Sequence, residues 1–256
     1  MCLASCSFVS KDFDTSDKDN LVIQLITYVL DQAHYLDKEI NDEFSEKVFN
    51  TFLENLDPFK RYFYSSDIKD FSAYKYSIDD AFKNPNLEFF DLVYERYSKR
   101  MSESEEIFKE ILSQPFDFSK DEVCECDFEV LDYVKTKDEL YGRWRKLLKI
   151  YVIENYHDEI KLDLKKQEED IEFNPRTLAE IEKETRDALS VTMNDNYRFI
   201  TQEIQRGDWL SIYINSFVSQ YDPNTSYLDP ESKDRFDVDM SGNYAGIGAR
   251  LQKKID

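Results

Sequence analysis

Apolar side chains recur at three- and four-residue steps along most of this chain, the spacing that places side chains on one face of an α-helix. The clearest stripe covers residues 20–36, and a second covers residues 44–56. The second stripe ends at Asp57-Pro58, because proline disfavours helical backbone in the residue before it. We expect these two helices to pack against each other as a hairpin.

The middle of the chain predicts two further helices, over residues 67–85 and 87–112. Asp67 carries a carboxylate that can cap free backbone N–H groups at the start of the first, and Pro115 follows the end of the second. Residues 116–134 are acidic and lack a regular period, so we expect a loop or short extended structure there.

The next two helices are predicted from their capping residues. Thr136 and Glu139 form a capping box that opens a fifth helix reaching about His157. Residues 161–172 are a mixed-charge run, typical of a solvated helix face or a mobile link. Asn174 as cap and Pro175 at the first helical position then predict a long helix towards Ile204.

Gly207-Asp208 predicts the break before a helix over residues 209–221, which is hydrophobic on most of its surface and is therefore expected at the centre of the fold. A short helix is predicted over residues 231–236, and a glycine loop leading into a strand over residues 242–251. The fold class is mainly α. We divide the chain into a flexible leader (1–18), a multi-helix domain (19–236) and a segment of different character (237–256).

Composition supports a globular chain with a sizeable core. Of the 256 residues, 41% are hydrophobic and 15% aromatic, more than a disordered chain carries. The formal net charge of −21 argues against a nucleic-acid partner, since phosphate binding is driven by clustered lysine and arginine. No stretch approaches the ~20 apolar residues of a transmembrane helix.

Histidine and cysteine give little support to metal or redox chemistry. The four cysteines do not form a disulfide framework in a chain of this length. Cys124 and Cys126 have His34 and His157 as the available nitrogen ligands, so no metal site and no cofactor are predicted. Both histidines are interpreted as structural or surface residues.

Two Ser-x-x-Lys matches, Ser66 with Lys69 and Ser72 with Lys75, have the spacing that can place a serine beside a lysine base. Their surroundings are polar, whereas a lysine needs an apolar site to lower its pKa. We therefore interpret them as surface and capping residues. Trp144 and Trp209 lie in register with other apolar residues and are interpreted as core anchors.

The first residues contain Leu3-Ala4-Ser5-Cys6, which has the form of a bacterial lipobox, in which the cysteine becomes lipidated. The charged and apolar regions of a signal peptide do not precede it. Two interpretations stay open: a truncated start with a lipidated Cys6, or a chance match.

Two spaced motifs lie near the end of the chain: D-P-N-T-S-Y-L over residues 222–228 and G-I-G-A over residues 246–249. With Met240 between them, they resemble the segment that enters the PDZ domain of carboxy-terminal processing (tail-specific) serine proteases. Upstream, Leu56-Asp57-Pro58 and Ser66-Asp67-Ile68, with Phe71, look like a second segment of that family. The resemblance covers the chain from about residue 20 to its end.

The resemblance implies a periplasmic or cell-envelope serine endopeptidase that recognises apolar C-terminal tails of protein substrates. It implies that residues 19–236 are the helical N-terminal domain and that residues 237–256 start a truncated PDZ domain with its first strand. In this family a serine nucleophile and a lysine base lie well downstream of G-I-G-A, so no catalytic residue is expected in this chain. An envelope adaptor protein and a lipid anchor on the leader are further expected partners.

Gly246, Ile247, Gly248 and Ala249 have two interpretations. Glycines permit tight backbone turns at the start of a strand. With the resemblance, they are a carboxylate-binding loop whose backbone N–H groups hold a peptide C-terminus while the peptide adds a strand to the sheet edge. The alternative to a protease segment is a non-enzymatic helical adaptor whose grooves bind other proteins.

Overall fold

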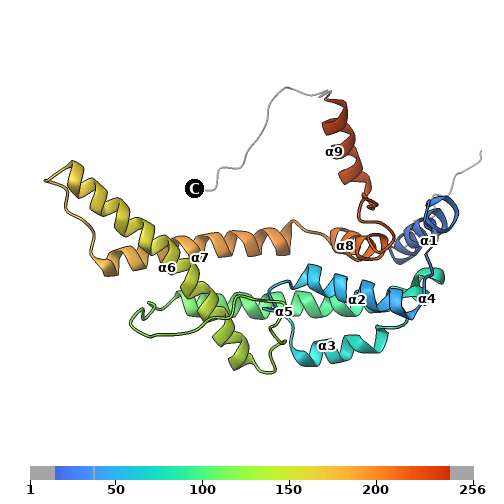
Figure 1. Ribbon diagram of the computed structural model, residues 1–256, viewed down its shortest axis with the longest axis horizontal. Helices are drawn as coiled ribbons and strands as arrows, with labels where there is room; N and C mark the ends of the chain where they lie inside the picture. Colours follow the sequence, from blue (N-terminus) through green and yellow to red (C-terminus); the bar gives the residue numbers. More distant parts are fainter. Residues whose placement is uncertain (1–14, 37, 243–256) are drawn as a thin grey trace, which may run out of the picture.

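The computed structural model describes residues 15–36 and 38–242, and this part of the chain is 69% helical (Figure 1). The prediction of a mainly α fold is confirmed. In chain order, the elements are α1 (Thr15–Ala33), α2 (Asp42–Leu56), α3 (Ser65–Phe71), the 3-10 turn η1 (Ser72–Tyr74), α4 (Ile78–Lys83), α5 (Glu88–Leu112), α6 (Lys137–Glu169), α7 (Leu178–Gln202), α8 (Arg206–Val218) and α9 (Pro230–Ser241). The predicted strand lies outside the described residues.

The core is aromatic and is centred on α8, which packs against α2 and α5. Tyr213 and Phe217 of α8 are almost completely buried. Phe217 stacks on Phe82 of α4 with ring centroids 3.6 Å apart, and Phe44 of α2 meets it edge-on. The prediction that this apolar helix is central is confirmed.

The predicted hairpin of the first two helices is wrong. α1 packs against α4, whereas α2 packs against α4 and α8 (Figure 1). Ile23 and Leu30 of α1 are buried in the common core, so the apolar stripe is real although its partner is different. Periodicity identifies the buried face of a helix and does not identify what covers it.

The single helix predicted over residues 67–85 is divided into α3, η1 and α4. The division follows from contacts with α2. The hydroxyl of Ser45 accepts a hydrogen bond from the backbone N–H of Asp79 (2.9 Å) and donates one to the Asp79 carboxylate (2.7 Å), which fixes the start of α4. Because Ser45 and Asp79 are 34 residues apart, the sequence around Asp79 gives no signal for a helix start there.

The fifth helix is longer than predicted, because α6 continues past His157 to Glu169. Asp163 stabilises the added turns: it is buried and accepts hydrogen bonds from the side chain and backbone N–H of Arg176. Most of the mixed-charge run is therefore helical. α6 and α7 pack against each other and form an arm at one end of the molecule (Figure 1).

Two predicted helix starts are also corrected. α7 begins after Thr177, whose capping box with Glu180 replaces the predicted cap at Asn174. Gly207 lies within the first turn of α8, where the Asp208 carboxylate accepts a hydrogen bond from the backbone N–H of Gln205, the residue before the helix (2.8 Å). In both places the helix starts where a carboxylate of its first turn accepts from the backbone N–H of the preceding residue.

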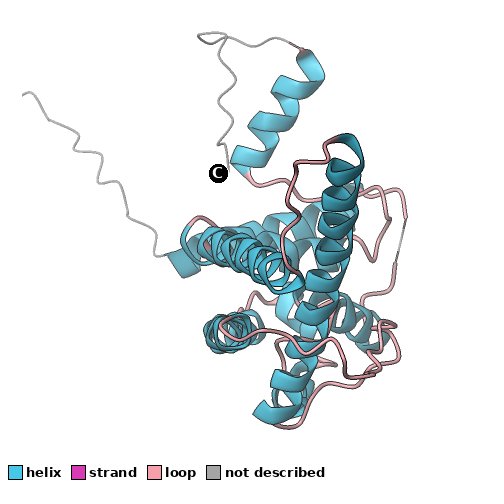
Figure 2. Cartoon of the chain, turned by 90° about the vertical axis from the view of Figure 1, so that its left-hand side faces the viewer, coloured by secondary structure: helices cyan, strands magenta, loops and turns pink. Residues whose placement is uncertain are grey.

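The ends of the predicted helical domain differ slightly from the helices observed. α1 begins at Thr15, inside the predicted leader, and α9 continues past Phe236 to Ser241, where Gly242 adopts a left-handed conformation with φ 64°. α9 has no buried residue and stands away from the other helices in both views (Figures 1 and 2). Its position therefore depends on the segment that precedes it.

Candidate functional site

The segment between α8 and α9, residues 219–229, contains the D-P-N-T-S-Y-L motif and forms a turn followed by backbone without regular secondary structure. The Asp222 carboxylate accepts a hydrogen bond from the backbone N–H of Asn224 (3.2 Å), and the N–H of Thr225 donates to the Asp222 carbonyl (3.0 Å). At the other end, Asp229 caps α9 by accepting from the N–H of Ser232 (3.0 Å), and Pro230 occupies the first turn. The motif thus encodes a turn and a helix start.

Asn215 of α8 forms two hydrogen bonds to the part of this segment that follows the turn. Its side-chain oxygen accepts from the backbone N–H of Tyr227 (2.7 Å), and its side-chain nitrogen donates to the Tyr227 carbonyl (3.0 Å). One amide therefore satisfies both backbone groups of one residue, which fixes the register of the segment against α8. On the other side, the ring of His34 lies 3.2 Å from the Thr225 hydroxyl.

An apolar groove of about 260 Å³ runs between α1 and this segment. Leu25 and Val29 of α1 are each 55% exposed along it, and Leu228 of the segment is 41% exposed. One wall of the groove is formed by residues 225–228, which directly precede the cap of α9.

The second motif, around Asp57, forms the turn after α2. The Asp57 carboxylate is almost fully buried and accepts hydrogen bonds from the backbone N–H groups of Arg61 (2.8 Å), Tyr62 (3.0 Å) and Phe63 (3.0 Å). Burial raises the pKa of Asp57, and the three backbone hydrogen bonds oppose this shift. Asp57 therefore closes the turn from α2 towards α3.

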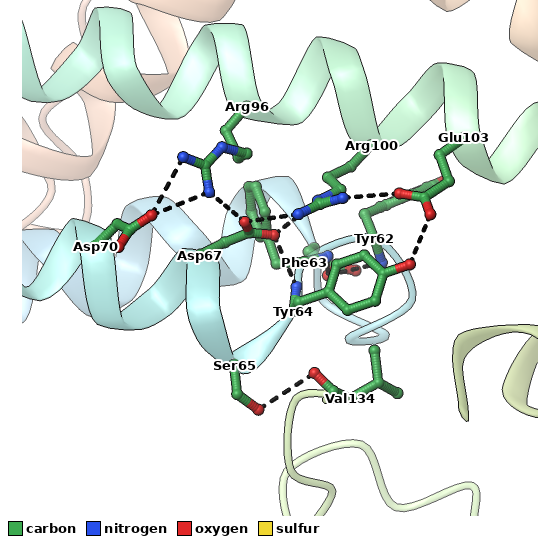
Figure 3. A network of polar contacts seen from close by, with 11 residues as sticks. Tyr62, Phe63, Tyr64, Ser65, Asp67, Asp70, Arg96, Arg100, Glu103 and Val134 are labelled. Carbon is green, nitrogen blue, oxygen red and sulfur yellow. Dashed lines mark hydrogen bonds and ion pairs between the residues drawn. The ribbon is translucent and has the colours of Figure 1, made fainter. Parts of the chain in front are cut away.

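Asp67 ties α3 to α5 in a buried ion-pair network (Figure 3). Its carboxylate accepts from the backbone N–H of Tyr64 (2.9 Å), from Arg100 Nε (2.8 Å) and Nη2 (2.9 Å), and from Arg96. Burial acts to raise the pKa of Asp67, but hydrogen bonds from Arg100, Tyr64 and Arg96 outweigh it, so the pKa is lowered. Asp67 stays charged at neutral pH.

Outer members of the network complete the corner. Asp70 pairs with Arg96 (3.2 Å), and Glu103 accepts from both Arg100 (2.8 Å) and the Tyr64 hydroxyl (2.8 Å). The arrangement is structural: two arginines of α5 hold the turn before α3.

Neither Ser-x-x-Lys match forms a dry site that could keep a lysine neutral. Ser66 and Lys69 are exposed on α3. The Ser72 hydroxyl donates to the Ile68 carbonyl (2.7 Å). Lys75 pairs with Glu46 (2.7 Å), whose hydrogen bond raises the pKa of the lysine, the opposite of what a lysine base requires.

The remaining candidate residues occupy separate places. Trp144 is buried and its indole N–H donates to the Arg61 carbonyl (3.0 Å), whereas Trp209 is partly buried against Tyr97. His157 is exposed. The thiols of Cys124 and Cys126 are free and lie in the loop between α5 and α6.

Residues 15–36 and 38–242 contain no group of three or more histidine, cysteine, aspartate or glutamate side chains that could hold a metal ion. Within the same ranges, no helix is long and apolar enough to cross a membrane. The predicted peptide-binding residues Gly246, Ile247, Gly248 and Ala249, and the predicted lipidation site Cys6, lie outside the described residues.

These features define a helical domain in which α8 is the last helix with buried residues and residues 219–229 connect it to the exposed helix α9. The family described as "Tail specific protease N-terminal domain" matches residues 26–231, and the chain belongs to this family. A curated relative, the tail-specific protease of Haemophilus influenzae, is 27% identical over 242 residues, covering 94% of this chain and 32% of that protein. The chain thus spans about a third of the length of this relative.

Sequence reasoning missed the residues that hold the two motifs in place. Asn215 is the one side-chain amide in α8, a helix that is apolar on most of its surface. Arg96 and Arg100 are four residues apart and so share one helix face, which predicts a common acidic partner. The partner itself, Asp67, follows only from the packing of α3 on α5.

Proposed function

We propose that this chain is the scaffold and substrate-recognition portion of a periplasmic serine endopeptidase that degrades or processes proteins from their C-terminal tails. Membership of the tail-specific protease N-terminal domain family is the observation that carries the proposal. The serine nucleophile and lysine base belong to a downstream part of the protein.

The two hydrogen bonds between the Asn215 side chain and the backbone of Tyr227 support the scaffold role. α9 buries no residue of its own, so the fixed segment before it sets the direction in which the chain leaves the helical domain. Small displacements of a peptide site relative to catalytic groups lower reaction rates strongly, by as much as about 100-fold for a shift of ~1 Å.

Gly246, Ile247, Gly248 and Ala249 are proposed to hold the substrate's terminal carboxylate through backbone N–H groups, with the substrate adding a strand to the PDZ sheet. Proteins with apolar C-terminal tails are the proposed substrates. No metal or other cofactor has a part in this proposal.

The proposed location is the periplasm or cell envelope of a bacterium, with Cys6 as the residue that carries a lipid anchor. An envelope adaptor protein is a further proposed partner. The apolar groove beside Leu25, Val29 and Leu228 supports this, because an amphipathic segment of a partner would bury its exposed side chains.

The proposal is tested with the full-length protein and a reporter protein that ends in either an apolar or a polar C-terminal tail. Faster loss of the apolar-tailed reporter is expected, as is loss of this cleavage on substitution of the downstream serine. No cleavage of either reporter, or equal cleavage of both, would contradict it.

The groove also favours a second function, a non-enzymatic helical adaptor that binds partner proteins. The same assay separates the two, because an adaptor leaves both reporters intact. Translation of the sequence beyond Asp256 gives an independent answer, since an adaptor lacks the serine and lysine of a protease.

A further inference from the structure

Arg61 lies in an aromatic cage, and within residues 15–36 and 38–242 its guanidinium group has no oxygen partner. The guanidinium carbon is 5.0 Å from the ring centroid of Phe59, 5.2 Å from that of Tyr62 and 5.0 Å from that of Trp144. Its Nε atom is buried without a hydrogen-bond acceptor in the part of the chain that the structure describes. The rings stabilise the positive charge, but they do not replace the hydrogen bonds to water that the buried nitrogen has lost.

Arg61 differs in this respect from the other arginines between residues 15 and 242. Each of the nine others donates to at least one carboxylate, carbonyl or hydroxyl oxygen: Arg96, Arg100, Arg143, Arg145, Arg176, Arg186, Arg198, Arg206 and Arg235. In a chain of net charge −21, an arginine whose guanidinium has no oxygen partner among the described residues is unexpected.

The nearby carboxylate of Asp57 does not fill this role. It lies close enough for Arg61 to act on its pKa, but its oxygens accept from three backbone N–H groups and it is almost fully buried. The guanidinium thus keeps its hydrogen-bonding capacity for another anion.

A cavity of about 320 Å³ opens beside Arg61. Its lining combines this cation with apolar surface from α7, including Met193, Phe199 and Ile200. Tyr197, also in the lining, has a buried hydroxyl that lies beside Tyr62, and Asn196 adds a polar side chain. The cavity therefore offers one positive charge beside a largely apolar wall.

We propose that this cavity binds the C-terminal residue of a peptide that ends in an apolar side chain, with the terminal carboxylate on Arg61 and the side chain against Met193, Phe199 and Ile200. A terminal residue carries its carboxylate and its side chain on the same carbon. It can therefore place a charge on the guanidinium and an apolar group in the adjoining cavity at once. The guanidinium fork matches the two oxygens of a carboxylate.

Charge favours this ligand over more highly charged anions. The field of a protein with net charge −21 opposes the approach of a phosphate group or a polyacidic segment more strongly than that of a single carboxylate. The apolar walls add affinity only for a ligand with apolar surface beside its charge.

Ile200 also lines a neighbouring groove of about 200 Å³, with Tyr94, Met101 and Trp209. Side chains that precede the terminal residue of the peptide can occupy this groove. The site is separate from the proposed loop at Gly246, and it does not depend on the protease function, because it requires only α7 and the turn between α2 and α3.

The test uses the 256-residue chain and the fluorescein-labelled hexapeptide Gly-Ser-Gly-Ser-Val-Phe, with binding measured by fluorescence anisotropy. Three peptides are compared: the free acid, the C-terminal amide, and a free acid that ends in serine. The free acid ending in phenylalanine is expected to bind at least tenfold more tightly than the other two, because a hydrogen bond to a charged group is worth about tenfold or more in affinity.

Arg61→Met keeps an unbranched apolar side chain among the rings, and it is expected to weaken binding of the free acid about tenfold or more while leaving the amide unchanged. Arg198→Met is the matched control: it removes the same charge from an exposed arginine of α7 outside the cavity lining, and it should bind as the unmodified chain does. If Arg61→Met fails to fold, Phe199→Ser provides the second arm, because Phe199 is 57% exposed and its loss should weaken binding without unfolding.

Three results would overturn the proposal: no binding of any peptide, equal binding of acid and amide, or equal effects of Arg61→Met and Arg198→Met. Retained binding in both Arg61→Met and Phe199→Ser would assign the peptide to another site, such as the loop at Gly246, and would also overturn it.

Discussion

Replacement of Asp67 by alanine tests the reasoning about the buried network most sharply. Asp67 has a side chain with 0% exposure, and its two partners Arg96 and Arg100 are 24% and 15% exposed. Removing one member of a buried ion pair typically costs about 3–5 kcal/mol, because the other member is left buried and unpaired. Arg96 retains Asp70 and Arg100 retains Glu103, which places the expected loss at the lower end of this range.

Asp67 also caps the backbone N–H of Tyr64, and the loss of a helix cap costs about 1 kcal/mol. We therefore expect Asp67→Ala to lower the free energy of unfolding by about 3 to 4 kcal/mol. Asp70→Ala is the matched control: its carboxylate pairs with the same Arg96, but it is 55% exposed, so a loss of at most about 1 kcal/mol is expected.

The measurement is urea unfolding followed by circular dichroism, with the midpoint and slope fitted for each protein. A lower midpoint with unchanged slope reports lost stability of the same native state. If Asp67→Ala lost less than about 1 kcal/mol, or no more than Asp70→Ala, Asp67 would not be the buried centre of this network.

Three further predictions concern the core, a helix cap and pH dependence. Phe217→Ala should cost about 3–5 kcal/mol in urea unfolding, while Phe236→Ala, on exposed α9, should cost almost nothing; equal losses would contradict the assigned core. Thr177→Ala should cost about 1 kcal/mol by the same assay, and no loss would show that the capping box is unimportant. Hydrogen bonds from Arg145 and Lys149 lower the pKa of Glu122 from 4.5 to about 2, so its stabilisation is complete above pH 4.5 and is lost as the pH falls towards 2. Glu122→Gln should therefore flatten the fall of the melting temperature over this range, and an unchanged fall would refute the assignment.

Helix periodicity identified most of the fold, because a buried stripe leaves a local record in the sequence. Residues 44–56 and 87–112 were predicted to within a few residues of α2 and α5. The hairpin and the break between α3 and α4 were missed because they depend on contacts between residues far apart in the chain, whereas the starts of α7 and α8 were missed although they depend on hydrogen bonds within the first turn. Ser45, which belongs to α2, fixes the start of α4. The ion pair of Asp163 with Arg176 stabilises the last turns of α6, over residues for which the charge pattern allowed either a helix or a mobile link.

The candidate site was less accessible from sequence. The motifs containing Asp57 and Asp67 were recognised by their resemblance, but their roles as buried acceptors depend on tertiary packing. Asn215 is the one side-chain amide in α8, yet its partner Tyr227 is fixed only by the fold. The unpaired state of Arg61 is a property of its surroundings and has no sequence signature.

The central claim is that the helical domain fixes the segment through which the chain enters the rest of a tail-specific protease. Asn215→Leu removes both hydrogen bonds to Tyr227 while keeping a side chain of similar size. Asn155→Leu is the control, because Asn155 is an exposed helix residue that bonds only within α6.

The direct measurement is the rate at which the full-length protein degrades an apolar-tailed reporter, with folding of each variant checked by circular dichroism. The account predicts that Asn215→Leu stays folded and degrades the reporter about tenfold or more slowly, whereas Asn155→Leu retains the full rate. A folded Asn215→Leu protein with an undiminished rate would contradict it.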